Sequence, residues 1–344
     1  MKAALLHEPL KVSIEEIEIP ACGPHEVLVE VKSCGVCATD VKKFTGSSKA
    51  PFLPFILGHE PAGVVSTIGG AFRGNLKVGD RVAISPVIVC GSCHGCKSGL
   101  TSREGMGMCE NYEVLGFSIN GAFTEFIVCD PRNITEIPDA LSFQDAALIE
   151  PVAACANGVL RSLTTPPGNA VVLGAGFMGL VSMQLLKLLG ARVLIADLLD
   201  DRLELARAMG ADETVNPHAE DLEEKVKVFS GQRGAESIIC AVGNKGLTES
   251  AITMLARGGK IVLLASAGHN TTVEFNLNAL HYSQSIITGS VSYTDATYAW
   301  SIELLAHGAL RTEGLITSVG KLDRVQEFME MTRDQSGIKK VIVF

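Results

Sequence analysis

The chain has 344 residues, and this length suggests about two domains because one hydrophobic core rarely serves so long a chain. Hydrophobic residues make up 47% of it and glycine occurs 35 times, which fits a well-buried α/β protein and argues against disorder. The formal net charge is -9 and no block of Lys and Arg occurs. The chain therefore lacks the cluster of basic residues by which proteins bind nucleic acid or an anionic membrane surface, and these two functions are not indicated.

The amino-terminal apolar run, residues 3–6, is too short for the core of a signal peptide, and no later stretch is long enough to span a bilayer. We therefore expect a soluble cytoplasmic protein whose ten cysteines are reduced. In a reducing compartment, clustered cysteines indicate metal ligands rather than disulfides.

The first part of the chain shows the pattern of a β domain. Residues 26–32 alternate valine with more polar neighbours, as a half-buried strand does. Similar short runs occur at residues 63–67, 81–84 and 123–129, with glycine-containing turns between them. Together they predict an antiparallel, barrel-like domain.

The pattern then changes to strands that alternate with helices. The glycine-containing segment at residues 174–179 leads into a helix that runs through residue 189, and residues 201–209 form a second predicted helix; a glycine closes each one. The expected strands are residues 170–173, 193–196, 237–242, 260–264 and 285–288. This order predicts a doubly wound parallel sheet. Residues from 290 onward lose the pattern, so we expect domains at 1–152 and 153–289, with 290–344 returning to the first domain.

A glycine turn in the second domain indicates a dinucleotide site. Gly174, Gly176 and Gly179 lie between a strand and a helix, where the backbone can approach a pyrophosphate at the helix N-terminus. Asp197 ends the next strand, where its carboxylate would bind both ribose hydroxyls and repel a 2'-phosphate, so NAD is favoured over NADP. The alternative is a glycine-rich turn that binds no ligand. The motif also contains Phe177 and Met178.

Four further residues are candidates for the same site. Arg202 lies one turn beyond Asp197 and could pack near the adenine or hold a phosphate. Val242, Ala265 and Ser266 stand at predicted strand ends and are expected to line the crevice at the carboxyl edge of the sheet. Each of these three could instead be ordinary core.

A second set of residues indicates a catalytic metal. Cys34 and Cys37, either of which could supply a thiolate, follow the strand at 26–32; His59 and Glu60 come about twenty residues later, and Glu150 stands near the domain border. A thiolate, an imidazole and carboxylates can form a tetrahedral zinc site with one open position. Such a site lowers the pKa of a bound alcohol. Taken singly, either cysteine could be a buried hydrophobe, the histidine structural, and Glu150 a carboxylate at a helix start.

Four cysteines form a separate cluster. A zinc site is the favoured interpretation, and the alternatives are redox-active disulfides or thiols that bind nothing. Four thiolates would satisfy zinc and leave no open position, so this site would be structural. The polar, glycine-containing loop at residues 101–108 is expected to bulge outward. The cluster consists of Cys90, Cys93, Cys96 and Cys109.

Over essentially its whole length the chain resembles the zinc-containing medium-chain dehydrogenase/reductase family. Residues 58–63 match the family's Gly-His-Glu zinc signature, Gly69 supplies its next glycine, and Phe72 stands where a smaller residue is usual. The CxxCxxC start of the cysteine cluster is also similar to the family's structural zinc lobe, although twelve residues separate Cys96 from Cys109, a longer insert than usual. The resemblance implies a GroES-like catalytic domain and a Rossmann cofactor domain.

The resemblance also implies roles for the first metal set. Cys37 and His59 would be zinc ligands, with Glu60 a ligand or a close exchanging neighbour. Glu150 occupies a position that is cysteine in ordinary alcohol dehydrogenases and glutamate in the polyol and threonine dehydrogenases, which favours a polyol or an amino alcohol as substrate.

The resemblance also implies roles for three residues that follow the ligand cysteine in the sequence. Thr39 would accept the alcohol proton, and Asp40 would orient His59. Lys42 stands where the family often has a histidine that completes the proton relay. It could pass the proton or bind a cofactor phosphate or ribose instead, with solvent accepting the proton directly.

We therefore expect a zinc-dependent oxidoreductase, with one catalytic and one structural zinc, that transfers a hydride between a secondary alcohol and NAD. Its partners would be a small alcohol or ketone, carrying a phosphate or not, and other copies of the chain in a dimer or tetramer. The alternatives are an NADP-linked aldehyde or ketone reductase, a zinc-free quinone reductase of the same family, and a non-catalytic NAD-binding protein.

Overall fold

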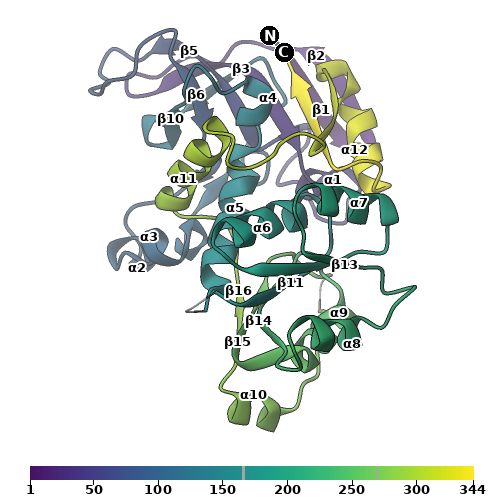
Figure 1. Cartoon of the computed structure of the whole chain (residues 1–344). Coiled ribbons are helices and arrows are strands. Elements are labelled where there is room, and N and C mark those ends of the chain that lie inside the picture. The colour runs from purple at the N-terminus through teal and green to yellow at the C-terminus, as the bar shows by residue number, and fades with distance from the viewer. Residues whose placement is uncertain (165–166, 269) are drawn as a thin grey trace. The chain divides into compact units, whose positions relative to one another are not determined.

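The computed structural model describes residues 1–164, 167–268 and 270–344 (Figure 1). These residues form two compact units. The first contains Met1–Pro151 and Tyr298–Phe344, and the second contains Val152–Thr297. No helix in the described part of the chain combines the length and the apolar character needed to cross a lipid bilayer.

The first unit is rich in strands. They are β1 (Lys2–Glu8), β2 (Lys11–Glu16), β3 (Val27–Val36), β4 (Phe55–Ile56), β5 (Glu60–Ile68), β6 (Arg81–Ile84), β7 (Val87–Ile88), β8 (Glu113–Val114), β9 (Phe126–Cys129), β10 (Ile134–Glu136), β17 (Ile316–Lys321) and β18 (Lys339–Val343). A seven-stranded sheet has the order β10-β6-β5-β3-β18-β17, with β9 also paired to β3. A three-stranded sheet has the order β2-β1-β4, and β7 pairs with β8.

Strand β3 is central to this sheet. Nearly all of its residues are buried, and it pairs with β5, β9 and β18. Strand pairs in the unit are antiparallel, as predicted, except that β17 and β18 run parallel. The exception arises because helix α12 (Val325–Arg333) carries the chain back between these two strands, and parallel neighbours need such a crossover. The carboxyl-terminal strand thereby lies directly beside the strand that leads to Cys37.

The helices of the first unit are short. They are α1 (Ala38–Phe44), α2 (His94–Lys97), α3 (Leu100–Glu104), α4 (Phe143–Ala146) and α12, with 3-10 turns η1 (Met106–Met108), η2 (Pro131–Asn133) and η3 (Leu322–Arg324). Helices α5 (Ile149–Ser162) and α11 (Asp295–Ala306) each contain residues of both units, since the borders after Pro151 and after Thr297 fall inside them. The insert predicted as a loop at residues 101–108 is folded instead: α3 and η1 occupy most of it.

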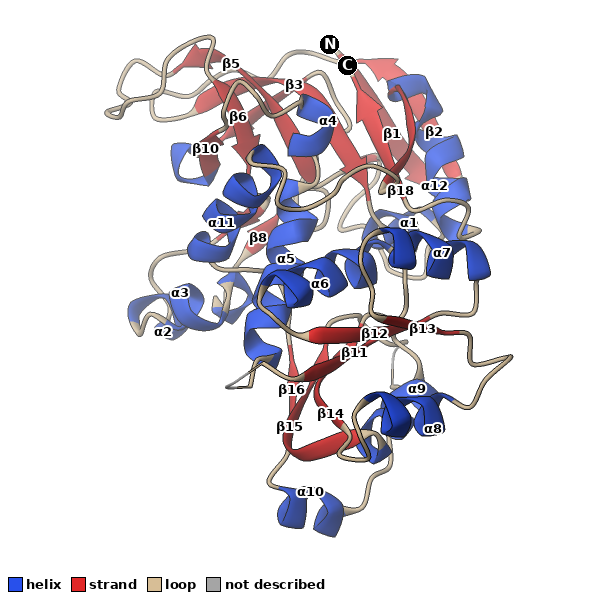
Figure 2. Ribbon diagram, in the orientation of Figure 1, coloured by secondary structure: helices blue, strands red, loops and turns tan. Residues whose placement is uncertain are grey.

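The second unit is a parallel sheet with helices on both faces (Figure 2). Its strands are β11 (Asn169–Leu173), β12 (Arg192–Ala196), β13 (Glu213–Val215), β14 (Ala235–Cys240), β15 (Leu255–Leu263) and β16 (Ile286–Gly289). Its helices are α6 (Phe177–Leu188), α7 (Asp200–Ala208), α8 (Leu222–Phe229), α9 (Lys245–Thr253) and α10 (Leu277–Ser283). Helices α6 and α7 lie on one side of the strands, and α8 and α9 on the other.

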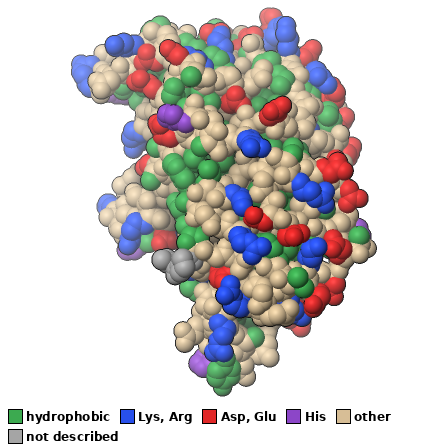
Figure 3. All heavy atoms as spheres, in the orientation of Figure 1, with side chains coloured by type: hydrophobic (Ala, Val, Ile, Leu, Met, Phe, Trp, Pro, Cys, Tyr) green, Lys and Arg blue, Asp and Glu red, His purple; other side chains and the backbone are tan. Residues whose placement is uncertain are grey.

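The sheet has the order β13-β12-β11-β14-β15-β16, so the chain adds β12 and β13 on one side of β11 and then β14, β15 and β16 on the other. At such a switch point, the carboxyl ends of the parallel strands form the edge of a crevice of the kind that binds dinucleotides. All five residues of β11 are buried, as expected for a strand covered on both faces. On the molecular face drawn in Figure 3, acidic and basic side chains are interspersed, in keeping with the modest net charge of -9.

Candidate active site and metal centres

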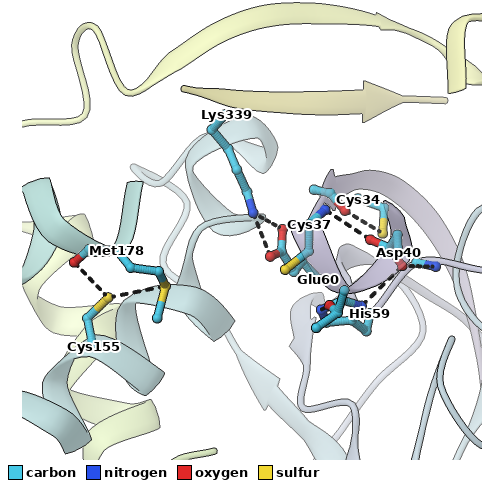
Figure 4. A network of polar contacts seen from close by, with 11 residues as sticks. Cys34, Cys37, Asp40, His59, Glu60, Cys155, Met178 and Lys339 are labelled. Atoms are coloured by element: carbon cyan, nitrogen blue, oxygen red, sulfur yellow. Dashed lines mark hydrogen bonds and ion pairs between the residues drawn. The ribbon is translucent and has the colours of Figure 1, made fainter. Parts of the chain in front are cut away.

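Three potential metal ligands come together in the first unit (Figure 4). Cys37 directly precedes α1, His59 precedes β5, and Glu60 is the first residue of β5. One sulfur, one nitrogen and one oxygen of these side chains lie within 4.8 Å of one another. The pairing of β3 with β5 places Gly35 opposite Glu60, and a Cβ at Gly35 would lie only 1.8 Å from Glu60 Oε2. Glycine therefore leaves the space that this carboxylate fills.

Asp40 connects the segments that carry these ligands. Its carboxylate is buried and accepts hydrogen bonds from the backbone N–H groups of Cys37 at 2.9 Å and Gly58 at 3.0 Å. Its Oδ1 also lies 3.3 Å from Nδ1 of His59. Burial lowers the pKa of His59, but the Asp40 carboxylate outweighs it and holds that pKa well above its usual value. Asp40 therefore fixes the orientation of the imidazole, whose other nitrogen remains for a ligand.

Thr39 and Lys42 differ in their relation to this group. The hydroxyl oxygen of Thr39 lies 3.2 Å from Nε2 of His59, so the predicted proton acceptor is adjacent to the predicted ligand. Lys42 lies on the exposed side of α1. The structure thus brings Thr39 to the group, whereas the lysine is directed toward solvent.

Lys339 joins the site, although no sequence motif indicated it. Its Nζ lies 2.5 Å from a carboxylate oxygen of Glu60, and both side chains are almost completely buried. Burial lowers the pKa of Lys339, but the negative charge of Glu60 has the opposite effect, and the pKa of Lys339 lies above its usual value. The residue is delivered by β18, 279 positions away in sequence, and this distance explains why no local pattern revealed it.

Glu150 lies at the start of α5, close to the ligand group but outside it. Burial raises the pKa of its carboxyl group to about 7, opposed by the charge of His59 and reinforced by that of Glu60. Among the described residues, its oxygens are not part of the group within 4.8 Å. The structure therefore places it beside Cys37, His59 and Glu60 rather than among them.

The donor set of this group fits a zinc ion. A cysteine sulfur, a histidine nitrogen and a carboxylate oxygen are the donor types of catalytic zinc sites, which keep a further position open. Glu60 Oε2 is buried and accepts no hydrogen bond of good geometry, although the ammonium of Lys339 is close. A carboxylate oxygen can accept at more than one site, so this buried oxygen can take a metal ion in addition to its ion pair with Lys339.

The four clustered cysteines also converge, in a segment that leaves β7 and returns at β8, residues 89–112, called here the cysteine lobe. Their sulfurs lie within 4.8 Å of one another. Cys93 Sγ lies 3.5 Å from Cys96 Sγ, and Cys109 Sγ lies 3.5 Å from Cys90 Sγ. A Cβ on Gly95 would lie 2.0 Å from the carbonyl oxygen of Met108, so glycine is needed where α2 closes against η1.

The chemistry of these thiols also suits a metal ion. Hydrogen bonds from Ser92 lower the pKa of Cys90 to about 5, and the backbone N–H of Glu110 lowers that of Cys93. Burial and the adjacent sulfurs raise the pKa of Cys96 to about 12, since a further thiolate is unfavourable there without a cation. Four sulfurs in this arrangement fit a closed, structural zinc site.

In the second unit, the glycines of the turn after β11 have three different environments. Gly174 has φ +102, and a Cβ there would lie 2.6 Å from Val242. A Cβ on Gly179 would lie 1.7 Å from the carbonyl oxygen of Gly174, so the helix can pack this closely only without a side chain. Gly176, which caps α6, has open space around it, and its nearest neighbour is Arg202 at 4.0 Å. The open position is the one where a phosphate could approach the helix N-terminus.

Asp197 lies at the carboxyl end of β12 and borders this turn. Its carboxylate accepts hydrogen bonds from the backbone N–H groups of Ala175 at 2.6 Å and Leu199 at 3.0 Å. Arg202 Nη1 lies 3.9 Å from Oδ2 of the same carboxylate. The acid is therefore held rigidly beside the turn, with a cation next to it.

The remaining cofactor candidates lie at the same edge of the sheet. Strand β14 ends at Cys240, two residues before the expected end, so Val242 belongs to the loop that touches Gly174. The backbone N–H of Ala265 bonds to the carbonyl of Cys240 at 3.1 Å. Ser266 is exposed in the following loop, while Phe177 and Met178 are half-buried in the first turn of α6.

Two family models match the sequence. Residues 23–139 match the alcohol dehydrogenase GroES-like domain, and residues 178–307 match the zinc-binding dehydrogenase family. Among curated proteins, the sorbitol dehydrogenase of Bacillus subtilis (strain 168) is 32% identical over 335 residues, which cover 96% of this chain and 93% of that protein.

Solved structures agree with these matches. A short chain alcohol dehydrogenase from E. coli CFT073, complexed with the cofactor NADH, is 30% identical with a TM-score of 0.90, covering 100% of this chain and 99% of that chain. A Sinorhizobium meliloti 1021 protein bound to NADP is 27% identical with a TM-score of 0.90 over the same shares of the two chains. The likeness therefore extends over both units.

Proposed function

The chain belongs to the zinc-containing medium-chain dehydrogenase/reductase family, and on this premise we propose that it transfers a hydride between a secondary alcohol and NAD. Family membership makes it an oxidoreductase that acts on alcohols, with the predicted GroES-like and Rossmann folds. The substrate we propose is a polyol, a sugar alcohol or an amino alcohol. The observation that carries the proposal is the convergence of Cys37, His59 and Glu60 beside Thr39.

In this proposal the chain's own residues position the reactants and the proton. Cys37, His59 and Glu60 would hold a zinc ion, with Glu150 as the adjacent carboxylate. Asp40 keeps the imidazole of His59 in one orientation through Nδ1.

When bound, zinc supplies a Lewis acid and NAD supplies the hydride acceptor, the two functions that alcohol oxidation requires. The hydroxyl oxygen of Thr39, 3.2 Å from His59 Nε2, accepts the proton of the alcohol. As the Thr39 hydroxyl accepts this proton, it releases its own proton to solvent. The four cysteines of the cysteine lobe would hold a second, structural zinc.

For the cofactor we propose NAD, bound at the turn formed by Gly174, Gly176 and Gly179. Related structures contain NADH in one case and NADP in another. The choice for this chain therefore rests on Asp197, whose carboxylate lies at the end of β12 where a 2'-phosphate would meet like charge.

Replacing Asp197 with serine is expected to lower the ratio of kcat/KM for NAD over NADP by about a hundredfold, since a like-charge contact of several kcal/mol disappears. Arg202 would then be available to bind the phosphate. Steady-state kinetics with both cofactors measures the ratio. Asp201→Ser, which removes an exposed acid from α7, is the matched control and is expected to leave the ratio unchanged. A wild-type preference for NADP contradicts the assignment.

The proposed activity is tested by NAD reduction on zinc-loaded protein. We expect turnover with at least one of sorbitol, xylitol, 2-propanol, L-threonine, D-gluconate and sorbitol 6-phosphate, measured by nicotinamide absorbance. Turnover of L-threonine alone would favour the amino alcohol class. No turnover with any compound, despite bound NAD and full zinc content, would count against the dehydrogenase and favour a non-catalytic protein that binds NAD.

A further inference from the structure

Lys43 is a buried cation on α1 that the proposed mechanism does not use. Only 4% of the residue is exposed. Its ammonium donates a hydrogen bond to the carbonyl oxygen of Lys49 at 2.9 Å and lies 4.3 Å from the ring centroid of Phe117 and 5.9 Å from that of Phe55. Among the residues that the structure describes, no carboxylate lies within 4.0 Å of it. Lysine is rarely buried so fully without an anionic partner.

The helix places this cation next to the reacting groups. Thr39 and Lys43 are four residues apart within α1, a spacing that puts two side chains on one helix face with Cβ atoms about 5–6 Å apart. Thr39 contacts His59. The side chain of Lys43 therefore leaves the helix one turn away from Thr39, the proposed proton acceptor.

The aromatic partner of the cation approaches the same group from another segment. Phe117 follows Gly116, and a Cβ on Gly116 would lie 2.5 Å from the carbonyl oxygen of Gly58, the residue before His59. Phe117 is still 42% exposed as a residue, although the ammonium of Lys43 lies over its ring. A partly exposed aromatic residue and a buried ammonium thus lie together at the edge of the ligand group.

The local partners leave the charge of Lys43 incompletely compensated. An ammonium has three hydrogen-bond donors, and the partners found among the described residues are one carbonyl and two ring faces. Burial lowers the pKa of Lys43, and the charge of Asp40 raises it in part. An anion bound at this point would replace the lost hydration of the ammonium with a charge-assisted hydrogen bond.

We propose that Lys43 binds an anionic group, a carboxylate or a phosphate, on the alcohol substrate. The preferred substrate is then a sugar acid or an alditol phosphate rather than a neutral polyol. This inference rests on the proposed function, because it names the substrate class of the same site.

The test compares matched ligands that differ in charge. Zinc-loaded protein saturated with NADH, which cannot turn an alcohol over, is titrated with D-gluconate, sorbitol 6-phosphate and sorbitol by calorimetry. At least one of the two anions is expected to bind about 30-fold more tightly than sorbitol, the effect of one charge-assisted hydrogen bond. The anion that binds more tightly identifies carboxylate or phosphate as the recognised group.

Variants assign the preference to Lys43. Lys43→Met is expected to abolish the preference for the anion. If this variant does not fold, Lys43→Gln replaces it, because glutamine keeps a donor for the carbonyl of Lys49; the same loss of preference is expected. Lys77→Met removes an exposed lysine of the same unit and is expected to keep the preference. NADH affinity and the melting temperature establish that each variant is folded.

Two outcomes overturn the inference: equal binding of sorbitol and both anions, or a preference for an anion that survives in Lys43→Gln. If neutral alcohols are oxidised without any preference that depends on Lys43, this inference fails and the proposed function stands. If an anion binds through Lys43 but no alcohol, charged or neutral, is oxidised, the proposed function fails and the anion site stands.

Discussion

Replacement of Cys37 with alanine is expected to lower kcat/KM on the preferred alcohol by about a thousandfold or more. The change removes the thiolate from the group formed with His59 and Glu60, and a Lewis acid held there is worth several kcal/mol of transition-state stabilisation. NAD affinity is expected to stay within about threefold, because the residues proposed to bind the cofactor belong to the second unit. Steady-state kinetics, zinc analysis and a fluorescence titration with NADH measure the three quantities.

The matched control for this variant is Cys34→Ala. Cys34 comes from the same segment and is fully buried, but its thiol donates to the carbonyl of Gly35 and is not part of the ligand group. This control is expected to keep its zinc and most of its turnover. Equal loss of activity in the two variants, or loss of NAD binding together with turnover in Cys37→Ala, would contradict the role assigned to Cys37.

Replacement of Cys93 with serine is expected to remove one zinc ion per chain and to unfold the cysteine lobe locally. The lobe holds four sulfurs within 4.8 Å but only short helices, and α3 contains no buried residue. Metal binding must therefore supply much of its folding free energy, and structural zinc supplies about 10 kcal/mol or more in small zinc peptides. Zinc analysis and amide hydrogen exchange over residues 89–112 measure the effect.

Cys22→Ser is the matched control, because Cys22 is a half-buried cysteine of the same unit outside both ligand groups. It is expected to retain the zinc content and the exchange protection of the lobe. Unchanged zinc content in Cys93→Ser would show that the four cysteines do not hold a metal. A strong chelator applied to the wild-type chain should reproduce the loss of protection in the lobe.

Local spacing is what made most of the site predictable. The glycines of the turn at residues 174–179 and the four cysteines lie close together in the chain, so their backbone geometry follows from short-range requirements. The structure adds the reason for each glycine, such as the 1.7 Å separation that a Cβ on Gly179 would have from a carbonyl oxygen. The insert at residues 101–108 was expected to be a loop because it is polar and contains glycine, yet α3 and η1 fold most of it.

Contacts between distant segments could not be predicted in this way. Lys339 reaches Glu60 because β18 pairs with β3 and β3 pairs with β5, and no sequence pattern encodes that register across 279 positions. Adjacent lysines on α1 illustrate the same limit. Lys42 is exposed and Lys43 is buried, since one residue along a helix turns the side chain by about 100° and only the packing decides which one is covered.

By itself the sequence predicted a β domain, a parallel α/β domain and the residue types that could bind metal, because these follow from periodicity and short spacing. The family, with its GroES-like and Rossmann folds, came from the resemblance of the motifs. Only the tertiary structure decided which residues share a site. It set Glu60 within the ligand group and Glu150 beside it, joined Lys339 to Glu60, and buried Lys43 with its ammonium over the ring of Phe117. The physical reason is that strand register and side-chain packing depend on contacts between remote segments, whose free energy no local pattern in the chain contains.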